Sequence, residues 1–340
     1  MRLDRWFKRR LPGLALSHLN KIVRTGEVRV DGARAKVSTR LAAGQDVRVP
    51  PMRGDEAVPA AKRPAAVSEA DRRAIADMTL FEDRDVLVLN KPAGLAVQGG
   101  SGTKRHLDGM LEALANPKGE RPMLVHRLDR DTAGVLLVAK SRKAAADLGA
   151  AFRARETRKI YWALVVGVPK PARGRISLFL AKGEGMGQER DGERGGAGDR
   201  EARERMRVAR HGEEDAQHSL TYYAIVDKVA PRVAWLSMRP VTGRTHQLRA
   251  HCEAIGHPIV GDPKYARLPE NARLDDPMRA LPPEVPRALH LLARRLTIPH
   301  PRAGIIDVTA PLPLHMRASF ELFGFDERTD DPILDAPDER

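Results

Sequence analysis

The 340-residue sequence has a single cysteine, no long apolar run and no phosphate-binding loop. With Cys252 alone, an intramolecular disulfide framework is excluded, and a reducing compartment is indicated. No segment approaches the roughly 18 to 20 consecutive apolar residues that a membrane-spanning helix requires, and the basic N-terminus lacks the apolar run of a secretory signal. The Gly-rich stretches at 99–102 and 191–197 lack the G-x-x-x-x-G-K-[ST] pattern. These absences predict a cytoplasmic protein with no membrane contact and no P-loop.

Positive charge is abundant and unevenly placed. The chain has 59 Lys and Arg against 45 Asp and Glu, a formal net charge of +14. Residues 1–50 hold 12 Lys and Arg against only four acidic residues. Such a basic segment favours a polyanionic partner, because each neutralised phosphate releases condensed counterions. A merely solubilising surface is the alternative that charge by itself leaves open.

Residues 1–50 show the pattern of a small mixed domain. Apolar residues at helical spacing predict one helix over 2–11 and a second over 15–25. Asp31-Gly32 then predicts a hairpin turn, and 45–49 reads as a further strand. This segment, with KIVRTGEVRVDG and GQDVRVP, resembles an S4 RNA-binding domain. Small basic modules of this shape also mediate protein contacts, which is the alternative.

The rest of the chain divides into three parts by composition. Residues 51–74 are rich in Pro, Ala and charge, which predicts a linker. Residues 75–325 alternate β-branched runs, such as 135–138 and 160–166, with helical stretches, and so predict an α/β or α+β domain. A charged, Gly-rich segment at 183–216 interrupts it as a surface insertion, and 326–340 is predicted to be a frayed acidic tail.

Three polar clusters are candidates for chemistry. They are HRLDRDTAG at 126–134, RPVTGRTHQLRAH at 239–251, and FEDRDVLVLNKPAGLAVQGG at 81–100. The first precedes an apolar run, VLLVAK, so its charged groups lie at the edge of a buried strand, where reactive residues are often found. On composition alone, a network of loop salt bridges is the favoured explanation of the first cluster.

In their order along the chain, the three clusters resemble the motifs of the RluA family of pseudouridine synthases. Members of this family modify ribosomal and transfer RNA through an HRLD-containing loop. The resemblance extends to RKIYWALVVG at 158–167, GHPIVGDPKYA at 256–266 and LHLLARRLTIPHP at 289–301. It implies an α+β fold with a mixed, mostly antiparallel central sheet flanked by helices. It further implies a monomeric, cofactor-independent and metal-free enzyme acting on large-subunit (23S) ribosomal RNA or a pre-ribosomal particle.

The resemblance also implies roles for individual residues. Asp129 matches the catalytic aspartate, with Asp131 as a rival two residues beyond the motif position. Arg244 matches the arginine that pairs with this aspartate and keeps it ionised. Tyr161 matches the tyrosine that lies against the target base. Arg127 resembles the arginine that fills the space left when the nucleotide is flipped out.

Two lysines and one departure from the family pattern complete the expectations. Lys91 and Lys159 are expected near the substrate, although most lysines in proteins are ordinary surface residues. Ala133 stands where the family has Ser, which puts hydrogen bonding around the active loop in doubt.

Three other functions remain as alternatives. One is a catalytically inactive RNA-binding or ribosome-assembly protein, suggested by Ala133 and the basic N-terminus. Another is a synthase acting on a different structured RNA. A third is a metal-dependent hydrolase using His246, His251, Cys252 and His257, which is disfavoured because their spacing matches no known ligand pattern.

Overall fold

The chain folds as two units, Met1–Val67 and Ser68–Arg340. The computed structural model describes residues 1–11, 13–14, 16–51, 68–100, 103, 105–117, 119–183, 205–266 and 281–335. Among these residues, no helix combines the length and the apolar character needed to cross a membrane.

The first unit packs two helices against a small antiparallel sheet of strand order β2-β1-β3. Its elements are α1 (Leu3–Arg10), α2 (Leu16–Arg24), β1 (Arg29–Val30), β2 (Ala33–Arg34) and β3 (Val47–Arg48). Leu3 and Phe7 of α1 pack on Leu19 and Ile22 of α2 in a core of buried apolar side chains. Asp31 and Gly32 have φ angles of 48° and 79°. Both are positive, as a tight type I′ hairpin turn requires, so the predicted turn is confirmed.

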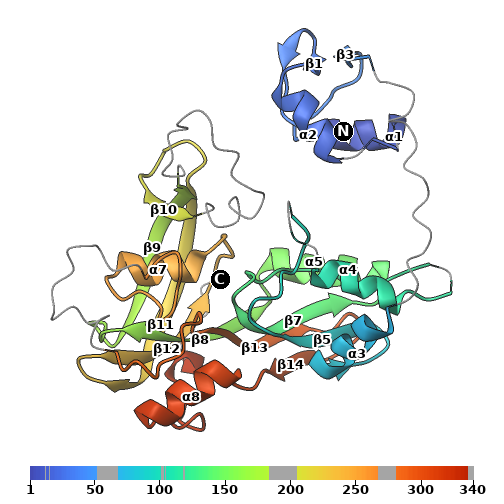
Figure 1. Ribbon diagram of the computed structural model, residues 1–340. Coiled ribbons are helices and arrows are strands. Elements are labelled where there is room, and N and C mark those ends of the chain that lie inside the picture. Colours follow the sequence, from blue (N-terminus) through green and yellow to red (C-terminus); the bar gives the residue numbers. More distant parts are fainter. Residues whose placement is uncertain are drawn as a thin grey trace. The chain divides into compact units, whose positions relative to one another are not determined.

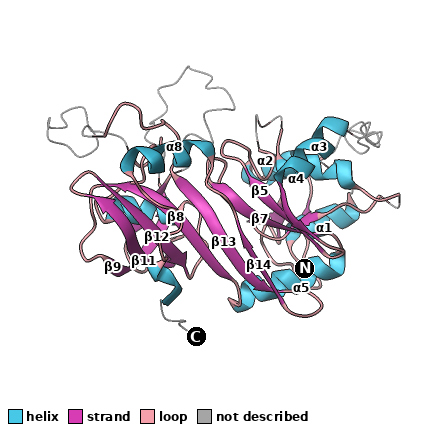
Figure 2. Ribbon diagram, turned by 90° about the horizontal axis from the view of Figure 1, so that it is seen from below, coloured by secondary structure: helices cyan, strands magenta, loops and turns pink. Residues whose placement is uncertain are grey.

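The second unit is built on a large mixed sheet, and Figures 1 and 2 show how its strands run side by side. Its strands follow the order β10-β9-β11-β12-β8-β13-β7-β5-β4, with β14 beside β13 and β6 beside β7. Among the described strands, β13 and β7 are the one parallel pair, and the other neighbours are antiparallel. The predicted mixed, mostly antiparallel sheet flanked by helices is therefore confirmed.

The bounds of these elements are as follows. The strands are β4 (Thr79–Glu82), β5 (Val86–Lys91), β6 (Met123–Leu124), β7 (Ala133–Ala139), β8 (Arg158–Val166), β9 (Arg173–Lys182), β10 (Met206–Ala209), β11 (Gln217–Val229), β12 (Val233–Pro240), β13 (Leu291–Pro299) and β14 (Ile305–Thr309). The helices are α3 (Glu69–Met78), α4 (Leu107–Met110), α5 (Arg142–Ala154), α7 (Gln247–Ala254) and α8 (Leu314–Phe323), with short 3-10 helices at Leu111–Leu114 and Pro332–Asp335.

The central strand β8 separates two parts of the core. Because successive side chains of a strand point to opposite faces, Ala163 and Val165 pack with residues of α7, whereas Trp162 and Leu164 pack with residues of α8. Figure 1 shows α7 and α8 on opposite sides of this part of the sheet. Tyr161 consequently lies on the α7 side, and that face carries the cavity described below.

Three predicted boundaries need correction. Helix α3 begins at Glu69, where the Ser68 side chain accepts a hydrogen bond from the Asp71 N–H, so the linker cannot extend to 74. Strand β10, Met206–Ala209, lies within the predicted insertion, of which 184–204 falls outside the described residues. The predicted tail is ordered to 335, because the Asp331 carboxylate accepts a 2.8 Å hydrogen bond from the Trp162 indole and Ile333 is buried.

Candidate active site

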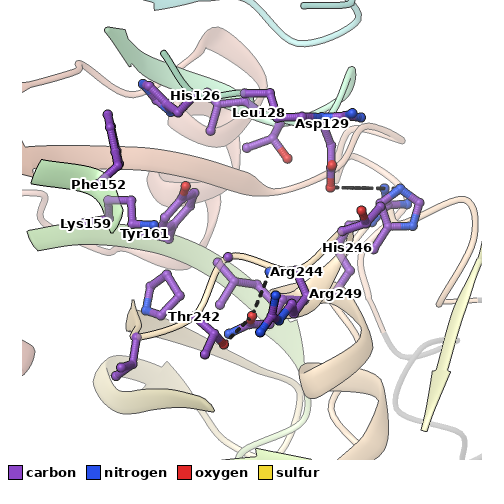
Figure 3. Close-up of a pocket in the computed structure, with 18 of the residues that line it drawn as sticks. His126, Leu128, Asp129, Phe152, Lys159, Tyr161, Thr242, Arg244, His246 and Arg249 are labelled. Carbon is purple, nitrogen blue, oxygen red and sulfur yellow. Dashed lines mark hydrogen bonds and ion pairs between the residues drawn. The ribbon is translucent and has the colours of Figure 1, made fainter. Parts of the chain in front are cut away.

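A cavity of about 490 Å³ opens beside β8, a size within the roughly 300 to 1,000 Å³ that small-molecule sites occupy. Its walls come from the loop before β7, the end of α5, the start of β8 and the turn leading into α7. Figure 3 shows Asp129, Tyr161 and Arg244 around this common space. Of the predicted site residues, those that line it are Asp129, Tyr161, Arg244, Arg127 and Lys159. Lys91 does not.

The loop that carries Asp129 is fixed to the sheet by His126. The Leu137 N–H of strand β7 donates a 2.8 Å hydrogen bond to His126 Nε2, and the imidazole ring packs on Phe152 with 4.9 Å between ring centroids. Burial, followed by the charge of Lys159, lowers the pKa of His126 to about 3. The neutral ring therefore serves as a structural acceptor, which rules it out as a proton carrier near neutral pH.

Two basic groups lie near the Asp129 carboxylate, whose side chain is 21% exposed. Oδ2 is 3.9 Å from Arg249 Nη1 and 4.0 Å from His246 Nε2. Arg249 uses its other two nitrogens on Asp262, with Nε and Nη2 each 2.7 Å from a carboxylate oxygen. Burial opposes the charge on Arg249, but the hydrogen bonds and charge of Asp262 raise its pKa, so the guanidinium beside Asp129 stays positive.

The predicted pairing of Arg244 with Asp129 is wrong. Arg244 Nε donates a 3.2 Å hydrogen bond to the His218 carbonyl oxygen, and its backbone N–H donates to the Gln247 side chain at 3.0 Å. The arginine that faces Asp129 is Arg249, five residues later and on the first turn of α7. Arg244 remains at the cavity wall as a cation.

Tyr161 and Lys159 both reach the cavity from β8. Burial, followed by the charge of Asp129, raises the pKa of the Tyr161 phenol, so its hydroxyl keeps its proton and can act as a donor. Burial lowers the pKa of Lys159. Arg127 is exposed at the cavity. Tyr161, Lys159 and Arg127 thus share one cavity with Asp129.

Lys91 is a structural residue, contrary to the expectation that it lies against substrate. It has no exposed surface, and its ammonium donates to the carbonyl oxygens of Pro92, Leu95 and Arg130 at 2.8, 2.9 and 2.8 Å. Burial lowers its pKa to about 7, against the charges of Asp131 and Asp129. Because Arg130 directly follows Asp129, Lys91 ties the active loop to the end of β5.

The histidines suspected of binding metal hold other partners. His251 Nε2 lies 2.8 Å from the Ser219 hydroxyl, His257 Nδ1 lies 2.9 Å from the Val166 carbonyl oxygen, and the Cys252 thiol contacts the Met238 sulfur. Within the described part of the chain, the His, Cys and acidic side chains grouped closely enough to hold a metal are those of Asp83, Asp85 and His300. His300 and Arg302 already pair with these carboxylates. No residue of the 246–257 stretch belongs to this group, so that stretch provides no ligand set.

Comparison with known proteins supports the same interpretation as the geometry. Residues 85–254, which include Asp129, Tyr161 and Arg249, match the sequence pattern of the family described as RNA pseudouridylate synthase. A protein of Escherichia coli K12 named Ribosomal large subunit pseudouridine synthase C is 36% identical over 315 residues, covering 92% of this chain and 89% of the relative. The chain belongs to the RNA pseudouridylate synthase family.

Further comparisons agree with membership in the pseudouridylate synthase family. The Vibrio vulnificus protein of the same name is 36% identical over 266 residues, covering 78% of this chain and 76% of the relative. The solved structure of Human RNA Pseudouridylate Synthase Domain Containing 4 superposes with a TM-score of 0.55 at 26% identity, covering 73% of this chain and 94% of the human one. The resemblance found in the sequence motifs is confirmed. The chain is an RNA pseudouridine synthase, and RNA is its partner.

The replacement of the family's Ser by Ala at position 133 lies outside the candidate active-site cavity. Ala133 is 1% exposed on β7, opposite Leu292 of β13, and it does not line the cavity. Thr132 lines it instead and supplies a hydroxyl at the neighbouring position. The change from Ser is thus accommodated in the core, which removes the main argument for an inactive protein.

Proposed function

We propose that this pseudouridine synthase isomerises specific uridines of large-subunit (23S) ribosomal RNA, with Asp129 as the catalytic nucleophile. The names of the Escherichia coli and Vibrio vulnificus relatives favour this RNA. In the reaction, the N-glycosidic bond breaks, the uracil rotates, and its C5 carbon bonds to the ribose C1′ carbon; C5 then loses its proton and N1 gains one, so that the product is an isomer. A group must hold the ribose or the base covalently in between, and an ionised carboxylate is competent for that.

The carboxylate of Asp129 makes no direct hydrogen bond to its two basic neighbours. Its contacts with Arg249 and His246 are 3.9 and 4.0 Å, longer than a direct hydrogen bond. The positive guanidinium lies beside the carboxylate, and both oxygens remain able to approach a substrate atom. This arrangement beside an open cavity is the observation that carries the proposal.

A uridine inside folded RNA must leave its stack before it can meet Asp129, at a cost of a few kcal/mol. In the proposed complex, the Tyr161 ring lies against the flipped uracil, and its protonated hydroxyl is available for proton transfer. Arg127, exposed at the cavity, fills the space that the base vacates. Lys159 and Arg244 contact the flanking phosphates.

The first unit acts in this proposal as an S4 RNA-binding module. Its helix α1 carries Lys8, Arg9 and Arg10 in the last turn, and the segment as a whole is strongly basic. A second RNA contact tethered to the catalytic unit raises the effective affinity by making binding multivalent. The protein is proposed to work as a cytoplasmic monomer on free ribosomal RNA or on a pre-ribosomal particle.

The experiment compares Asp129→Asn with Asp131→Asn, a control two residues away in the same loop and outside the cavity. Each purified variant is incubated with 23S RNA from a strain lacking the gene, and pseudouridine is mapped by carbodiimide modification and primer extension. Wild type and Asp131→Asn should restore the missing sites. Asp129→Asn should restore none while binding RNA and unfolding at the wild-type temperature.

Two results would contradict the proposal. Pseudouridine formation by Asp129→Asn at the wild-type rate would exclude this carboxylate as the nucleophile. A gene deletion that leaves every pseudouridine of large-subunit ribosomal RNA in place would exclude that RNA as the substrate and direct attention to another structured RNA.

A further inference from the structure

Tyr265 contacts both of the groups that face Asp129. It is 3% exposed and lies in the turn after α7. Its hydroxyl is 3.1 Å from His246 Nδ1, and its ring lies 5.2 Å from the Arg249 guanidinium carbon, in a cation–π contact. Tyr265 does not line the cavity, so any influence it has on the carboxylate must pass through His246 and Arg249.

The hydrogen bonds around Tyr265 have a defined direction. The backbone N–H of Met206 donates to the Tyr265 hydroxyl at 2.8 Å. The Tyr265 proton is then available to His246 Nδ1, and a neutral imidazole that accepts it there carries its own proton on Nε2. That nitrogen faces the Asp129 carboxylate. The opposite tautomer would point a nitrogen lone pair at a negative charge, which is electrostatically unfavourable.

Two guanidinium groups make cation–π contacts with the ring of Tyr265. Arg249 lies 5.2 Å from its centroid and Arg205 lies 5.1 Å from it. Arg205 is in turn paired with Glu253 on α7. Arg205 and Met206 lead into strand β10, so the edge of the sheet and the helix that carries Arg249 meet at this one aromatic ring.

We propose that Tyr265 is a positioning residue for the pseudouridine synthase reaction: through its hydroxyl it fixes the tautomer of His246, and through its ring it fixes the direction of Arg249, so that Asp129 meets an N–H on one side and a guanidinium on the other. The role rests on the function proposed above for Asp129. Tyr265 touches no reacting atom, and it acts by holding the two groups that orient the proposed nucleophile.

Removing the hydroxyl should change the titration of His246. Burial lowers the pKa of His246, against the raising effect of Asp129, while Arg249 and Lys264 lower it and Asp262 raises it. A donor at Nδ1 stabilises the neutral ring, since that nitrogen must give up its lone pair when it is protonated. Without the donor, the pKa of His246 should rise, while burial continues to hold it below the ordinary value for histidine.

The test uses Tyr265→Phe, which retains the ring that contacts the two guanidinium groups and removes only the hydroxyl. Tyr223→Phe is the matched control, because its buried hydroxyl also bonds a backbone group, the Pro171 carbonyl oxygen, but lies outside the cavity lining. Single-turnover rates and RNA affinity are measured from about pH 5 to pH 8. The His246 tautomer is read from the nitrogen-15 shifts of labelled, RNA-free protein.

For Tyr265→Phe we expect a rate about tenfold lower at neutral pH, an acid limb moved to higher pH, unchanged RNA affinity, and His246 no longer held with its proton on Nε2. Tyr223→Phe should match wild type in rate, acid limb, RNA affinity and His246 tautomer. Wild-type rates together with a wild-type tautomer in Tyr265→Phe would overturn the proposal, as would a loss of rate fully explained by lost stability or RNA binding. If wild type itself makes no pseudouridine, the proposed function fails, and the nitrogen-15 measurement still decides the role of Tyr265.

Discussion

Lowering the pH should destabilise the catalytic unit through its buried histidines. His251 and His290 have no exposed surface. Burial, followed by the charge of His218, lowers the pKa of His251 to about 4. Burial, followed by the charge of His315, lowers the pKa of His290 to about 4, although two backbone carbonyl oxygens oppose the shift. In the unfolded chain, both imidazoles recover a pKa of about 6.5.

The direction and the size of this loss of stability follow from the linkage between proton binding and unfolding. Below pH 6.5, the unfolded state binds protons that the folded state does not bind until about pH 4, so the free energy of unfolding falls as the pH falls. At pH 5, about 1.5 pH units below the unfolded pKa, each histidine costs about 2 kcal/mol, and the two together about 4 kcal/mol. Burial lowers the pKa of His126 and His246 as well, which adds to the loss. This loss is a large part of the free energy of unfolding of a typical protein, which is about 5 to 15 kcal/mol.

Urea denaturation at pH 7.5, 6.0 and 5.0 measures this loss directly. Replacing His251 with Gln should reduce the number of protons taken up on unfolding by about one, whereas replacing the exposed His211 with Gln removes no buried imidazole and should leave the pH dependence unchanged. A free energy of unfolding that changes by less than about 1 kcal/mol between pH 7.5 and pH 5 would refute the reasoning. If the prediction holds, activity at acid pH must be normalised to the folded fraction of each variant before the acid limbs of wild type and Tyr265→Phe are compared.

Two further predictions concern single residues near the cavity. Lys91→Met leaves three buried carbonyl oxygens without a charged donor, so thermal denaturation should show a loss of about 2 to 4 kcal/mol with little change in the RNA affinity of the folded protein. An RNA-binding defect at wild-type stability would instead restore Lys91 as a substrate contact. Arg155 ends α5 with a φ of 60°, so Arg155→Gly should stabilise the fold by up to about 1 kcal/mol. The same change should lower the salt dependence of RNA binding by about one phosphate contact, and a variant that is both less stable and fully RNA-competent would contradict both expectations.

The sequence located the active loop because local rules dominate there. HRLD precedes an apolar run, and that run forms β7, a strand buried along its whole length. The β-branched run at 160–166 likewise predicted most of β8, which the structure places at Arg158–Val166. The Asp-Gly turn of the first unit needs only the φ preferences of two residues. In each case, the determining interaction spans a few residues.

The choice between Arg244 and Arg249 depends on a longer-range feature. His246 has a φ of 50°, a left-handed conformation that reverses the chain just before α7 begins at Gln247. That reversal turns Arg249 into the core towards Asp262 and leaves Arg244 on the cavity wall. Both arginines occur in one short motif, so the missing information was the conformation of a single residue between them. The acidic residue of GDPKY, Asp262, was the sequence signal that a buried cation needed a partner.

The burial of Lys91 and the ordering of Asp331 near the C-terminus depend on partners that are distant in sequence. Lys91 is buried because Arg130 supplies one of its three carbonyl oxygens across 39 residues, and Asp331 is ordered because Trp162 donates to it across 169 residues. Composition alone reads a lysine beside a Gly-rich loop as exposed and an acidic terminus as frayed. Composition does not show that the Arg130 carbonyl oxygen and the Trp162 indole, on other parts of the chain, each need a hydrogen-bond partner.

The cavity combines the proposed nucleophile, Asp129, on a fixed loop with exposed cations at its wall. The active loop is tied down on both sides, since Lys91 and Gly94 bond the Arg130 carbonyl oxygen and His126 accepts from β7. At the cavity, Arg127 and Arg155 are exposed and make no ion pair within the described residues. Bond breaking at a defined carbon requires a carboxylate held to a fraction of an ångström. Phosphate contacts tolerate variation, because they depend mainly on charge. The rigid contacts of the cavity are therefore concentrated on the proposed nucleophile, and the two exposed guanidinium groups are left for the proposed phosphate contacts.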